Sequence, residues 1–228
     1  MIQMKNVTKK YSNGVVAVNG ISITIRRGEF VYVVGPSGAG KSTFIKLMYR
    51  EEKATAGDVL IDGENVGQLK NRQVPQLRRS LGVVFQDFKL LPRLTAYENV
   101  AFALEVTEHT PAEIRKRVME VLDLVGLSHK ARMLPHELSG GEQQRIAIAR
   151  SIVNNPKLVI ADEPTGNLDP DTSWEIMSIF EKINAQGTTV VMATHNKEIV
   201  NTARRRVIAI EGGIIVRDED GGEYGYER

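Results

Sequence analysis

The sequence predicts an α/β fold, in which helices cover a mostly parallel β-sheet and the chain adds an N-terminal antiparallel β lobe and an inserted helical lobe. Short β-branched apolar segments recur along the chain and end in glycine, polar or acidic residues. This continuous apolar pattern is typical of strands buried on both faces, and therefore of parallel sheets. The first thirty residues and residues from about 88 to 150 follow two different patterns, described below.

Five apolar segments are expected to form the parallel sheet: residues 31–34, 81–85, 158–161, 189–193 and 207–210. The N-terminal segment differs, because residues 15–18 and 21–25 flank the dipeptide Asn19-Gly20. Asn-Gly between two apolar segments is a strong signal for a tight hairpin turn. We therefore expect antiparallel strands at the N-terminus, joined at Asn19 and Gly20.

Residues from about 88 to 150 are expected to be mainly helical. Thr110-Pro111-Ala112-Glu113 is a capping box with proline at the first helical position. Apolar residues follow at helical spacing before Gly126, a plausible helix end: Ile114, Val118, Val121, Leu122 and Val125. We expect one domain over 1–228, with the core and β lobe at about 1–87 and 155–217, the helical lobe at about 88–154 and a polar tail at 218–228.

Composition limits the classes of function. The 228 residues can bury a substantial core, and the 30 basic and 28 acidic residues leave a net charge of +2. Nucleic acid is not an expected partner at this charge, although Arg204-Arg205-Arg206 could form a local patch. The absence of cysteine excludes disulfides and thiolate metal sites. No signal peptide or apolar segment of about 20 residues is visible, so we expect a cytoplasmic chain whose membrane role would require a partner.

A phosphate-binding motif, the phosphate loop, follows the first predicted core strand. Its residues are Gly35, Pro36, Ser37, Gly38, Ala39, Gly40, Lys41 and Ser42, which match G-x-x-x-x-G-K-[ST]. Backbone N–H groups and the helix that starts near Lys41 favour bound phosphate. Lys41 is expected to reach the β- and γ-phosphates, and Ser42 to ligate Mg²⁺. A plain glycine-rich turn would explain the glycines but not Lys41, whose charge opposes the helix dipole.

Two carboxylates follow the predicted strand 158–161. Asp162 and Glu163 would point to opposite sides of the strand, so they can have different roles. We expect Asp162 to hold Mg²⁺ and Glu163 to polarise the attacking water. The alternative, in which one of them only caps the next segment, leaves two carboxylates at an apolar strand end without a cation.

Residues 138–145, the signature segment, have the sequence LSGGEQQR. Ser139 and Glu142 fit a capping box, but Gly140 and Gly141 weaken a first helical turn by about 0.5–1 kcal/mol each relative to alanine. Two glycines are useful there if a second polyphosphate approaches the helix end. This segment resembles the signature of the ATP-binding-cassette (ABC) ATPases, and the remaining motifs of that family follow in order over nearly the whole chain.

The resemblance implies an ABC nucleotide-binding domain with a RecA-like core, ATP and Mg²⁺ as ligands, and a role for each matching residue. Tyr11 resembles the aromatic that stacks on adenine, and Thr43 continues the phosphate site. Gln86 resembles the glutamine that senses Mg²⁺ and the γ-phosphate, Glu163 the catalytic glutamate, and His195 the histidine on the γ-phosphate. The ATP contacts expected from a second subunit are Ser139, Gly140, Gly141 and Asp169. Two chains would then enclose two ATP molecules in an ATP-dependent homodimer.

Within the family the finer resemblance is to cell-division ATPases that act with an FtsX-like integral membrane protein. The supporting segments are 49–51, 85–92, 206–210 and the tail with Tyr224 and Tyr226. The resemblance implies a chain held at the cytoplasmic face of the membrane by its partner, where ATP-driven closure regulates cell-wall hydrolysis. Phe88, Leu90 and Leu91 follow Gln86 and are either core or the surface that receives a partner helix.

Several alternatives stay open. ATPase subunits of lipoprotein-release and macrolide-export transporters share the sequence EPTGNLD found at 163–169. A scaffold locked by nucleotide would lack turnover, which the intact Glu163 argues against. A soluble ABC ATPase of translation or DNA repair is disfavoured, because Lys41 and Ser139 are 98 positions apart with no heptad repeat between them.

Overall fold

A six-stranded sheet forms the core of the protein, and the computed structural model describes residues 1–107 and 109–225. The strand order is β10-β9-β3-β8-β7-β6. The pairs of β3 with β8 and β9, and of β7 with β6 and β8, are parallel, whereas β10 is antiparallel to β9. The strands are β3 (Phe30–Val34), β6 (Gly82–Val84), β7 (Leu158–Asp162), β8 (Thr189–Ala193), β9 (Arg206–Glu211) and β10 (Ile214–Glu219).

All five predicted core strands are present, and β10 is an additional edge strand. Gly212 and Gly213, both with positive φ, turn the chain from β9 into β10. β10 runs to Glu219, into the segment that the sequence assigned to the tail. Tyr226, one of the tail tyrosines in the finer resemblance, lies outside the described residues.

A second, four-stranded sheet forms the antiparallel β lobe, in the order β2-β1-β4-β5. Its strands are β1 (Ile2–Lys10), β2 (Val16–Ile25), β4 (Ala56–Ile61) and β5 (Glu64–Asn65). The predicted hairpin at Asn19-Gly20 is wrong, because both residues lie inside β2. The chain turns instead at a second Asn-Gly dipeptide, Asn13-Gly14, where the Tyr11 N–H donates to Val15 O at 2.8 Å.

Gly20 has a different use within β2. Its φ is +62°, and the register between β1 and β2 shifts between the pairs Val7–Ile21 and Lys9–Val18. A glycine in the left-handed region is typical of such a bulge. The β lobe therefore exists as predicted, with its turn a few residues earlier in the chain.

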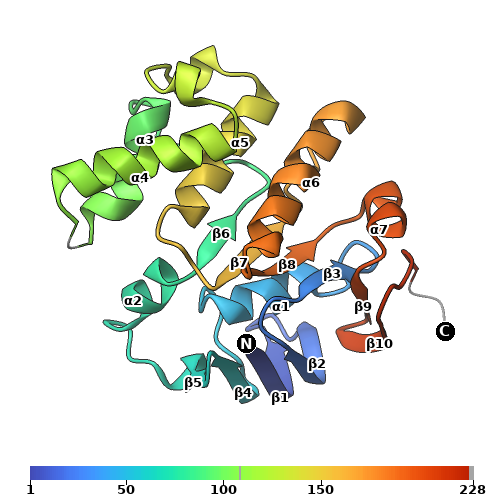
Figure 1. Cartoon of the computed structure of the whole chain (residues 1–228). Coiled ribbons are helices and arrows are strands. Elements are labelled where there is room, and N and C mark those ends of the chain that lie inside the picture. Colours follow the sequence, from blue (N-terminus) through green and yellow to red (C-terminus); the bar gives the residue numbers. More distant parts are fainter. Residues whose placement is uncertain (108, 226–228) are drawn as a thin grey trace.

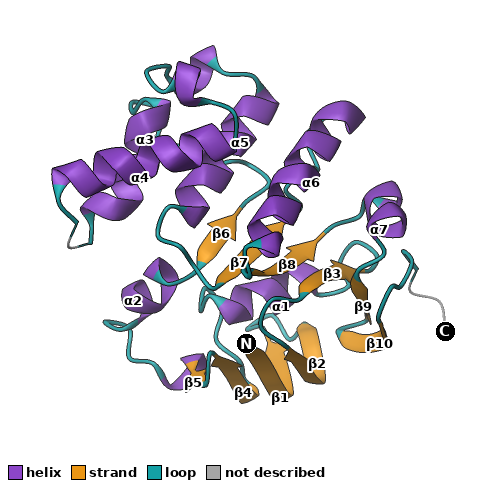
Figure 2. Ribbon diagram, viewed as in Figure 1, coloured by secondary structure: helices purple, strands orange, loops and turns teal. Residues whose placement is uncertain are grey.

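Helices cover both faces of the core sheet (Figure 2). Helix α1 (Lys41–Met48) packs between the two sheets, where Phe44, Ile45 and Leu47 join the apolar core of the β lobe. The other face carries α6 (Pro170–Ala185), α7 (Lys197–Ala203) and the helical lobe. The remaining helix of the core, α2 (Val74–Arg79), precedes β6.

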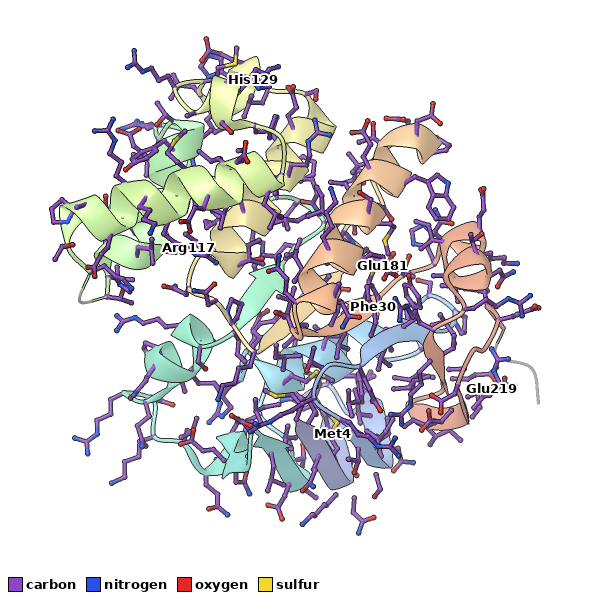
Figure 3. The ribbon with its side chains drawn as sticks, in the orientation of Figure 1. Met4, Phe30, Arg117, His129, Glu181 and Glu219 are labelled. Carbon is purple, nitrogen blue, oxygen red and sulfur yellow. The ribbon has the colours of Figure 1, made fainter. Side chains whose placement is uncertain are left out.

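The helical lobe contains α3 (Ala96–Glu105), α4 (Pro111–Leu124) and α5 (Gly140–Ile152) (Figure 1). Short 3₁₀ turns lie at Val66–Gln68, Ser128–Lys130 and Pro135–Glu137. The predicted capping box of Thr110 and Glu113 is present, Val118, Val121, Leu122 and Val125 are buried, and Gly126 follows the helix with φ +73°. The helical lobe and the β lobe form opposite ends of the molecule, marked by His129 and Met4 in Figure 3.

The arginines of the possible cationic patch are paired with carboxylates. The ion pairs join Arg204 to Glu223, Arg205 to Glu181, and Arg206 to both Glu29 and Asp218. Neighbouring acidic groups therefore neutralise this part of the surface.

None of the helices within the described residues combines the length and the apolar character that a membrane span requires.

Candidate active site

The phosphate loop connects β3 to α1 in a conformation that two of its glycines make possible. Gly35 has φ +147° and Gly40 has φ +105°. A Cβ at Gly35 would lie 2.0 Å from Ile210 O, and one at Gly40 would lie 2.1 Å from Ala17 O. Any larger residue would both strain the backbone and collide with a neighbouring carbonyl. The glycine spacing of the motif is therefore a packing requirement of the loop.

The first turn of α1 is suited to an anion. Its N-cap is Gly40, which provides no side-chain hydrogen bond, and the turn contains no acidic residue. The N–H groups at such a helix start lack intrahelical acceptors, and the helix dipole favours negative charge there. The Lys41 Nζ donates to Gly35 O at 2.8 Å and to Pro36 O at 3.1 Å. Carbonyl groups of the phosphate loop thus hold the ammonium of Lys41 beside the start of α1.

Ser42, in the first turn of α1, and Asp162, at the end of β7, lie close together. The Ser42 Oγ donates to Asp162 Oδ1 at 3.4 Å, although the two residues are 120 positions apart. Burial raises the pKa of Asp162, the hydrogen bond from Ser42 lowers it, and the charge of Glu163 raises it further. Two oxygen ligands of the predicted Mg²⁺ site are therefore close together, in surroundings that favour the arrival of a positive charge.

Glu163 lies directly after β7 in a strained backbone conformation, with φ +50°. Non-glycine residues in the left-handed region cost about 1–3 kcal/mol and cluster at active sites. The Glu163 Oε2 is 2.8 Å from His195 Nδ1 and accepts the His195 backbone N–H at 3.1 Å. His195 follows β8, so the parallel pairing of β7 with β8 brings these two residues together.

Gln86, after β6, forms a side-chain pair with Asn167. The Gln86 Nε2 donates to Asn167 Oδ1 at 3.1 Å, and the Asn167 Nδ2 donates to Gln86 O at 3.4 Å. Ser42, Gln86, Asp162, Glu163 and Asn167 line one cavity of about 370 Å³, which we call the catalytic cavity. The structure thus brings the predicted metal residues and the predicted catalytic glutamate to one place at the carboxyl edge of the parallel strands.

Tyr11 lies beside the phosphate loop helix. Its hydroxyl is 3.1 Å from Thr43 Oγ1, and the Lys9 Nζ is 4.9 Å from the centroid of its ring. The half-buried ring therefore stands next to the start of α1. Stacking on adenine stays a prediction.

The signature residues form a separate group. Ser139 is the N-cap of α5, where its side chain accepts from the Glu142 N–H, so the predicted capping box is present. Asp169 is the N-cap of α6 and accepts from the Thr172 N–H at 3.0 Å. A Cβ at Gly141 would lie 2.3 Å from Thr172 Cγ2. Gly141 and Asp169 thus meet through Thr172, and none of these residues lines the catalytic cavity.

Asn167 and Lys46 are polar residues of the cavity to which the sequence assigned no role. Asn167 lies within EPTGNLD, but its pairing with Gln86 depends on the fold and has no local signal. Lys46 lines the cavity, pairs with Glu51 at 3.0 Å and lies four residues after Ser42 on α1. Residues four apart share a helix face, so this spacing could have indicated Lys46.

Comparison with known proteins identifies the class. Residues 18–166 match the family model described as "ABC transporter". The ATP-binding cassette MJ0796, solved as a dimeric post-hydrolysis state bound to ADP and Pi, superposes with a TM-score of 0.88 at 39% identity, covering 98% of this chain and 100% of that one. These matches define an ABC-type ATPase domain.

Two bacterial relatives narrow this class. The cell division ATP-binding protein FtsE of Bacillus subtilis is 71% identical over 99% of each chain. FtsE of Streptococcus pneumoniae D39 is 64% identical over 100% of this chain and 99% of its own. The chain therefore belongs to the ABC transporter family and, within it, to the FtsE group of cell division ATP-binding proteins. The sequence-based recognition of the family, the fold class and the ATPase activity is confirmed.

Proposed function

We propose that this chain is the ATPase subunit of a membrane-bound cell-division complex, and that Glu163 activates the water that attacks the γ-phosphate of ATP. The observation that carries this proposal is the convergence of Ser42, Gln86, Asp162 and Glu163 on one cavity next to the phosphate loop. ATP bound with its phosphates in that loop would present the γ-phosphate to these side chains.

Each residue then has a role that follows from its position. Lys41 and the N–H groups of α1 hold the phosphates of ATP. Glu163 accepts the proton of the attacking water, while His195 keeps the Glu163 carboxylate oriented through the bond at 2.8 Å. Gln86 lines the same cavity. Its hydrogen bond to Asn167 links the position of its side chain to that of the segment after Glu163. Tyr11 stacks on the adenine ring.

The residues present fit Mg²⁺. This ion prefers oxygen ligands and usually keeps waters and substrate phosphates in its coordination shell, so one or two protein groups suffice. Ser42 and Asp162 supply two such oxygens within 3.4 Å of each other, and Gln86 lines the same cavity. Among the described residues there is no cluster of three or more His, Cys, Asp or Glu, which agrees with a site shared with phosphate. Bound there, Mg²⁺ would neutralise charge on the phosphates.

The signature residues are proposed to act on the ATP of a second subunit. Ser139, Gly140, Gly141 and Asp169 do not line the catalytic cavity of their own chain, and Figure 1 places α5 in the helical lobe and α1 against the core sheet. A two-fold dimer would place the signature segment of each chain against the ATP held by the other chain. The dimeric state of the related cassette MJ0796 supports this arrangement.

A groove beside the catalytic cavity is proposed to receive the membrane partner. It has a volume of about 480 Å³, and we call it the docking groove. Its apolar side chains are Leu81, Val83, Phe85, Leu91, Phe102, Ala103 and Val106. Leu91, Phe102 and Val106 are 36%, 48% and 43% exposed, which suits an inserted amphipathic helix.

Of the three residues considered from the sequence for docking, only Leu91 lines this groove. Leu90 packs against the core, and Phe88 lies near Gly140. The partner would be FtsX-like, since FtsE relatives are cell division proteins, and it would hold the chain at the cytoplasmic face of the membrane. ATP-driven closure of the dimer would then pass through the membrane to regulate cell-wall hydrolysis.

The variant Glu163→Gln tests the proposed chemistry. It should retain ATP binding but slow steady-state phosphate release by about 100-fold or more, since the water loses its proton acceptor. An ATP-bound dimer should also accumulate, because closure is possible without hydrolysis. Phosphate release within about threefold of the wild-type rate would contradict the role of Glu163 as the base.

A further inference from the structure

The buried side chain of Gln144 joins three segments of the proposed site. Gln144 lies in α5, and its side chain has no exposed surface. Its Nε2 donates to Phe85 O at 3.3 Å and to Pro164 O at 2.7 Å. Phe85 directly precedes Gln86, and Pro164 directly follows Glu163. One carboxamide therefore connects the signature helix with the two loops that carry these catalytic side chains.

The orientation of this carboxamide is fixed. Both of its partners are backbone carbonyl oxygens, which only accept hydrogen bonds, so Nε2 must face them. The Gln144 Oε1 is buried, and no described residue donates a hydrogen bond to it. The unpaired Oε1 lowers stability, whereas the two bonds donated by Nε2 satisfy carbonyls that an apolar side chain would leave without this donor. The specific consequence of a glutamine at this position is therefore the link between the two loops.

The first turn of α5 is packed closely against neighbouring segments. A Cβ at Gly141 would lie 2.3 Å from Thr172 Cγ2, and one at Gly140 would lie 3.8 Å from Phe88 Cζ and 3.6 Å from Leu168 Cδ2. Phe88 follows Gln86, and Leu168 precedes Asp169. Because Gly141 has no free space beside Thr172, a shift of the first turn of α5 must move the start of α6 as well.

We propose that Gln144 is a positioning residue that couples the two ATP sites of the dimer. The inference rests on the proposed function, in which the first turn of α5 contacts the ATP of the partner subunit. Gln86 and Glu163 of the same chain act on its own ATP. When α5 moves onto the partner's nucleotide, Gln144 carries the carbonyls of Phe85 and Pro164 with it. Each site thus reaches its full hydrolysis rate when the other site also holds ATP, and a lower rate when it does not.

The test compares Gln144→Met with the wild-type protein. Methionine keeps the length of the side chain but cannot donate to the two carbonyls. In wild type, ATP hydrolysis should be cooperative, with a Hill coefficient approaching the limit of about 2 set by two sites. In Gln144→Met the coefficient should fall to about 1 and kcat should fall about 10-fold, while the affinity of the monomer for ATP changes less than about twofold.

Asn184→Leu is the matched control. The Asn184 Nδ2 also donates to two backbone carbonyls, Gly28 O at 2.9 Å and Thr188 O at 2.8 Å, but near the C-terminal end of α6 and outside the proposed site. Its loss should lower the melting temperature and leave the Hill coefficient unchanged. All rates are measured well below the melting temperature of each variant, at protein concentrations that keep the dimer formed.

Other results would overturn the inference. These are a Gln144→Met protein as cooperative as wild type, or a wild type that hydrolyses ATP without cooperativity. If Gln144→Met does not fold, Gln144→Leu removes the same donors with a shorter apolar side chain. Failure of both to fold would show that Gln144 supports the fold only. A wild type that neither dimerises with ATP nor releases phosphate would instead refute the proposed function itself.

Discussion

At the scale of single residues, Glu163 has a backbone conformation that is unfavourable for a residue other than glycine. Its φ is +50°, and its carboxylate accepts the backbone N–H of His195 and lies within hydrogen-bond distance of the His195 ring. The conformation persists because the β7 and β8 ends are fixed by their parallel pairing. Strain at this one residue positions a carboxylate at the cavity that Ser42 and Asp162 also line.

Tyr11 is the second residue whose role can be isolated. Tyr11→Ala should weaken ATP binding by about 1 kcal/mol, roughly fivefold, as expected for the loss of an aromatic stacking contact. The maximal hydrolysis rate should change little, because stacking stabilises the ground state and the transition state equally. Equilibrium titration with a fluorescent ATP analogue and steady-state phosphate release measure the two quantities.

Tyr11→Phe separates stacking from the hydroxyl contact with Thr43. It keeps the ring and should bind ATP nearly as well as wild type. If phenylalanine weakens binding as much as alanine does, the bond to Thr43 matters and the stacking role is wrong.

At the scale of elements, the signature helix α5 starts with a capping box reinforced by an ion pair. The Ser139 side chain accepts from the Glu142 N–H, and the Glu142 carboxylate accepts from the Ser139 N–H and pairs with Lys130. The hydrogen bond from Lys130, then that from the Ser139 backbone, lower the pKa of Glu142. This carboxylate thus ties α5 to the 3₁₀ turn at Ser128–Lys130.

The lowered pKa predicts a specific pH dependence of stability. A carboxyl group whose folded pKa is depressed contributes stability above its unfolded pKa of about 4.3, and loses it as pH falls through the folded pKa. Glu142→Gln should therefore be less stable than wild type by about 1 kcal/mol at pH 7. The difference should shrink progressively below about pH 4.3. Thermal unfolding across this pH range measures it.

Glu120→Gln is the control, because Glu120 pairs with Arg117 on the exposed face of α4. It should change stability by less than about 0.5 kcal/mol at every pH. A stability difference for Glu142→Gln that stays constant with pH would mean that the charge of Glu142 is not what holds the helix start.

Most elements with a local signal were predicted from the sequence, whereas pairings that arise only in the packed fold were not. The apolar segments gave β3 and β6 to β9, and the Thr110 capping box gave α4. The hairpin was misplaced because the chain contains two Asn-Gly dipeptides, and tertiary pairing uses Asn13-Gly14 as the turn. Helix α6 was missed although Asp169 and Pro170 form a recognisable helix start.

The same distinction applies to the site. The residues of the phosphate loop and the strand-end carboxylates are contiguous motifs, and the parallel sheet brings them together as expected. The hydrogen bond between Gln86 and Asn167 and the two bonds donated by Gln144 join segments up to 81 positions apart. The docking groove combines α2, the loop after β6, α3 and α5, so only the packed fold assembles it.

At the scale of the whole molecule, the catalytic cavity and the docking groove share a wall. Tyr49, Glu51, Phe85 and Lys89 line both. Tyr49 and Phe85 meet edge to face with their ring centroids 6.3 Å apart, and the Lys89 Nζ is 4.1 Å from the centroid of Phe85. A partner helix in the groove would therefore be separated from the catalytic cavity only by these shared side chains.

Charge on the exposed apolar surface of the groove should prevent docking. Leu91→Asp and Phe102→Asp should each retain the fold and ATP hydrolysis but reduce co-purification with the membrane partner by about 10-fold or more, as loss of a central apolar contact does. Met119→Asp is the matched control, since Met119 is 36% exposed like Leu91 and lies on α4 outside the groove. Equal recovery of the partner with all three variants would place the docking surface elsewhere.

The central claim, that each ATP is held by the phosphate loop of one chain and the signature segment of the other, can be tested by mixing two inactive variants. Lys41→Ala removes the ammonium from the phosphate loop. Gly140→Asp adds a negative charge at the start of α5, which the helix tolerates but a phosphate does not. In a mixed dimer both lesions fall in one site and the other site is intact.

Phosphate release by the mixture is the deciding measurement. Random pairing makes half of the dimers mixed, each with one intact site, so activity should return to at most about a quarter of the wild-type rate. Loss of coupling to the empty site lowers this value further, but the mixture should still be clearly more active than either variant alone. Each variant alone should stay inactive. If native mass spectrometry detects the mixed dimers and the mixture stays as inactive as its components, the signature segment does not act on the ATP of the partner subunit.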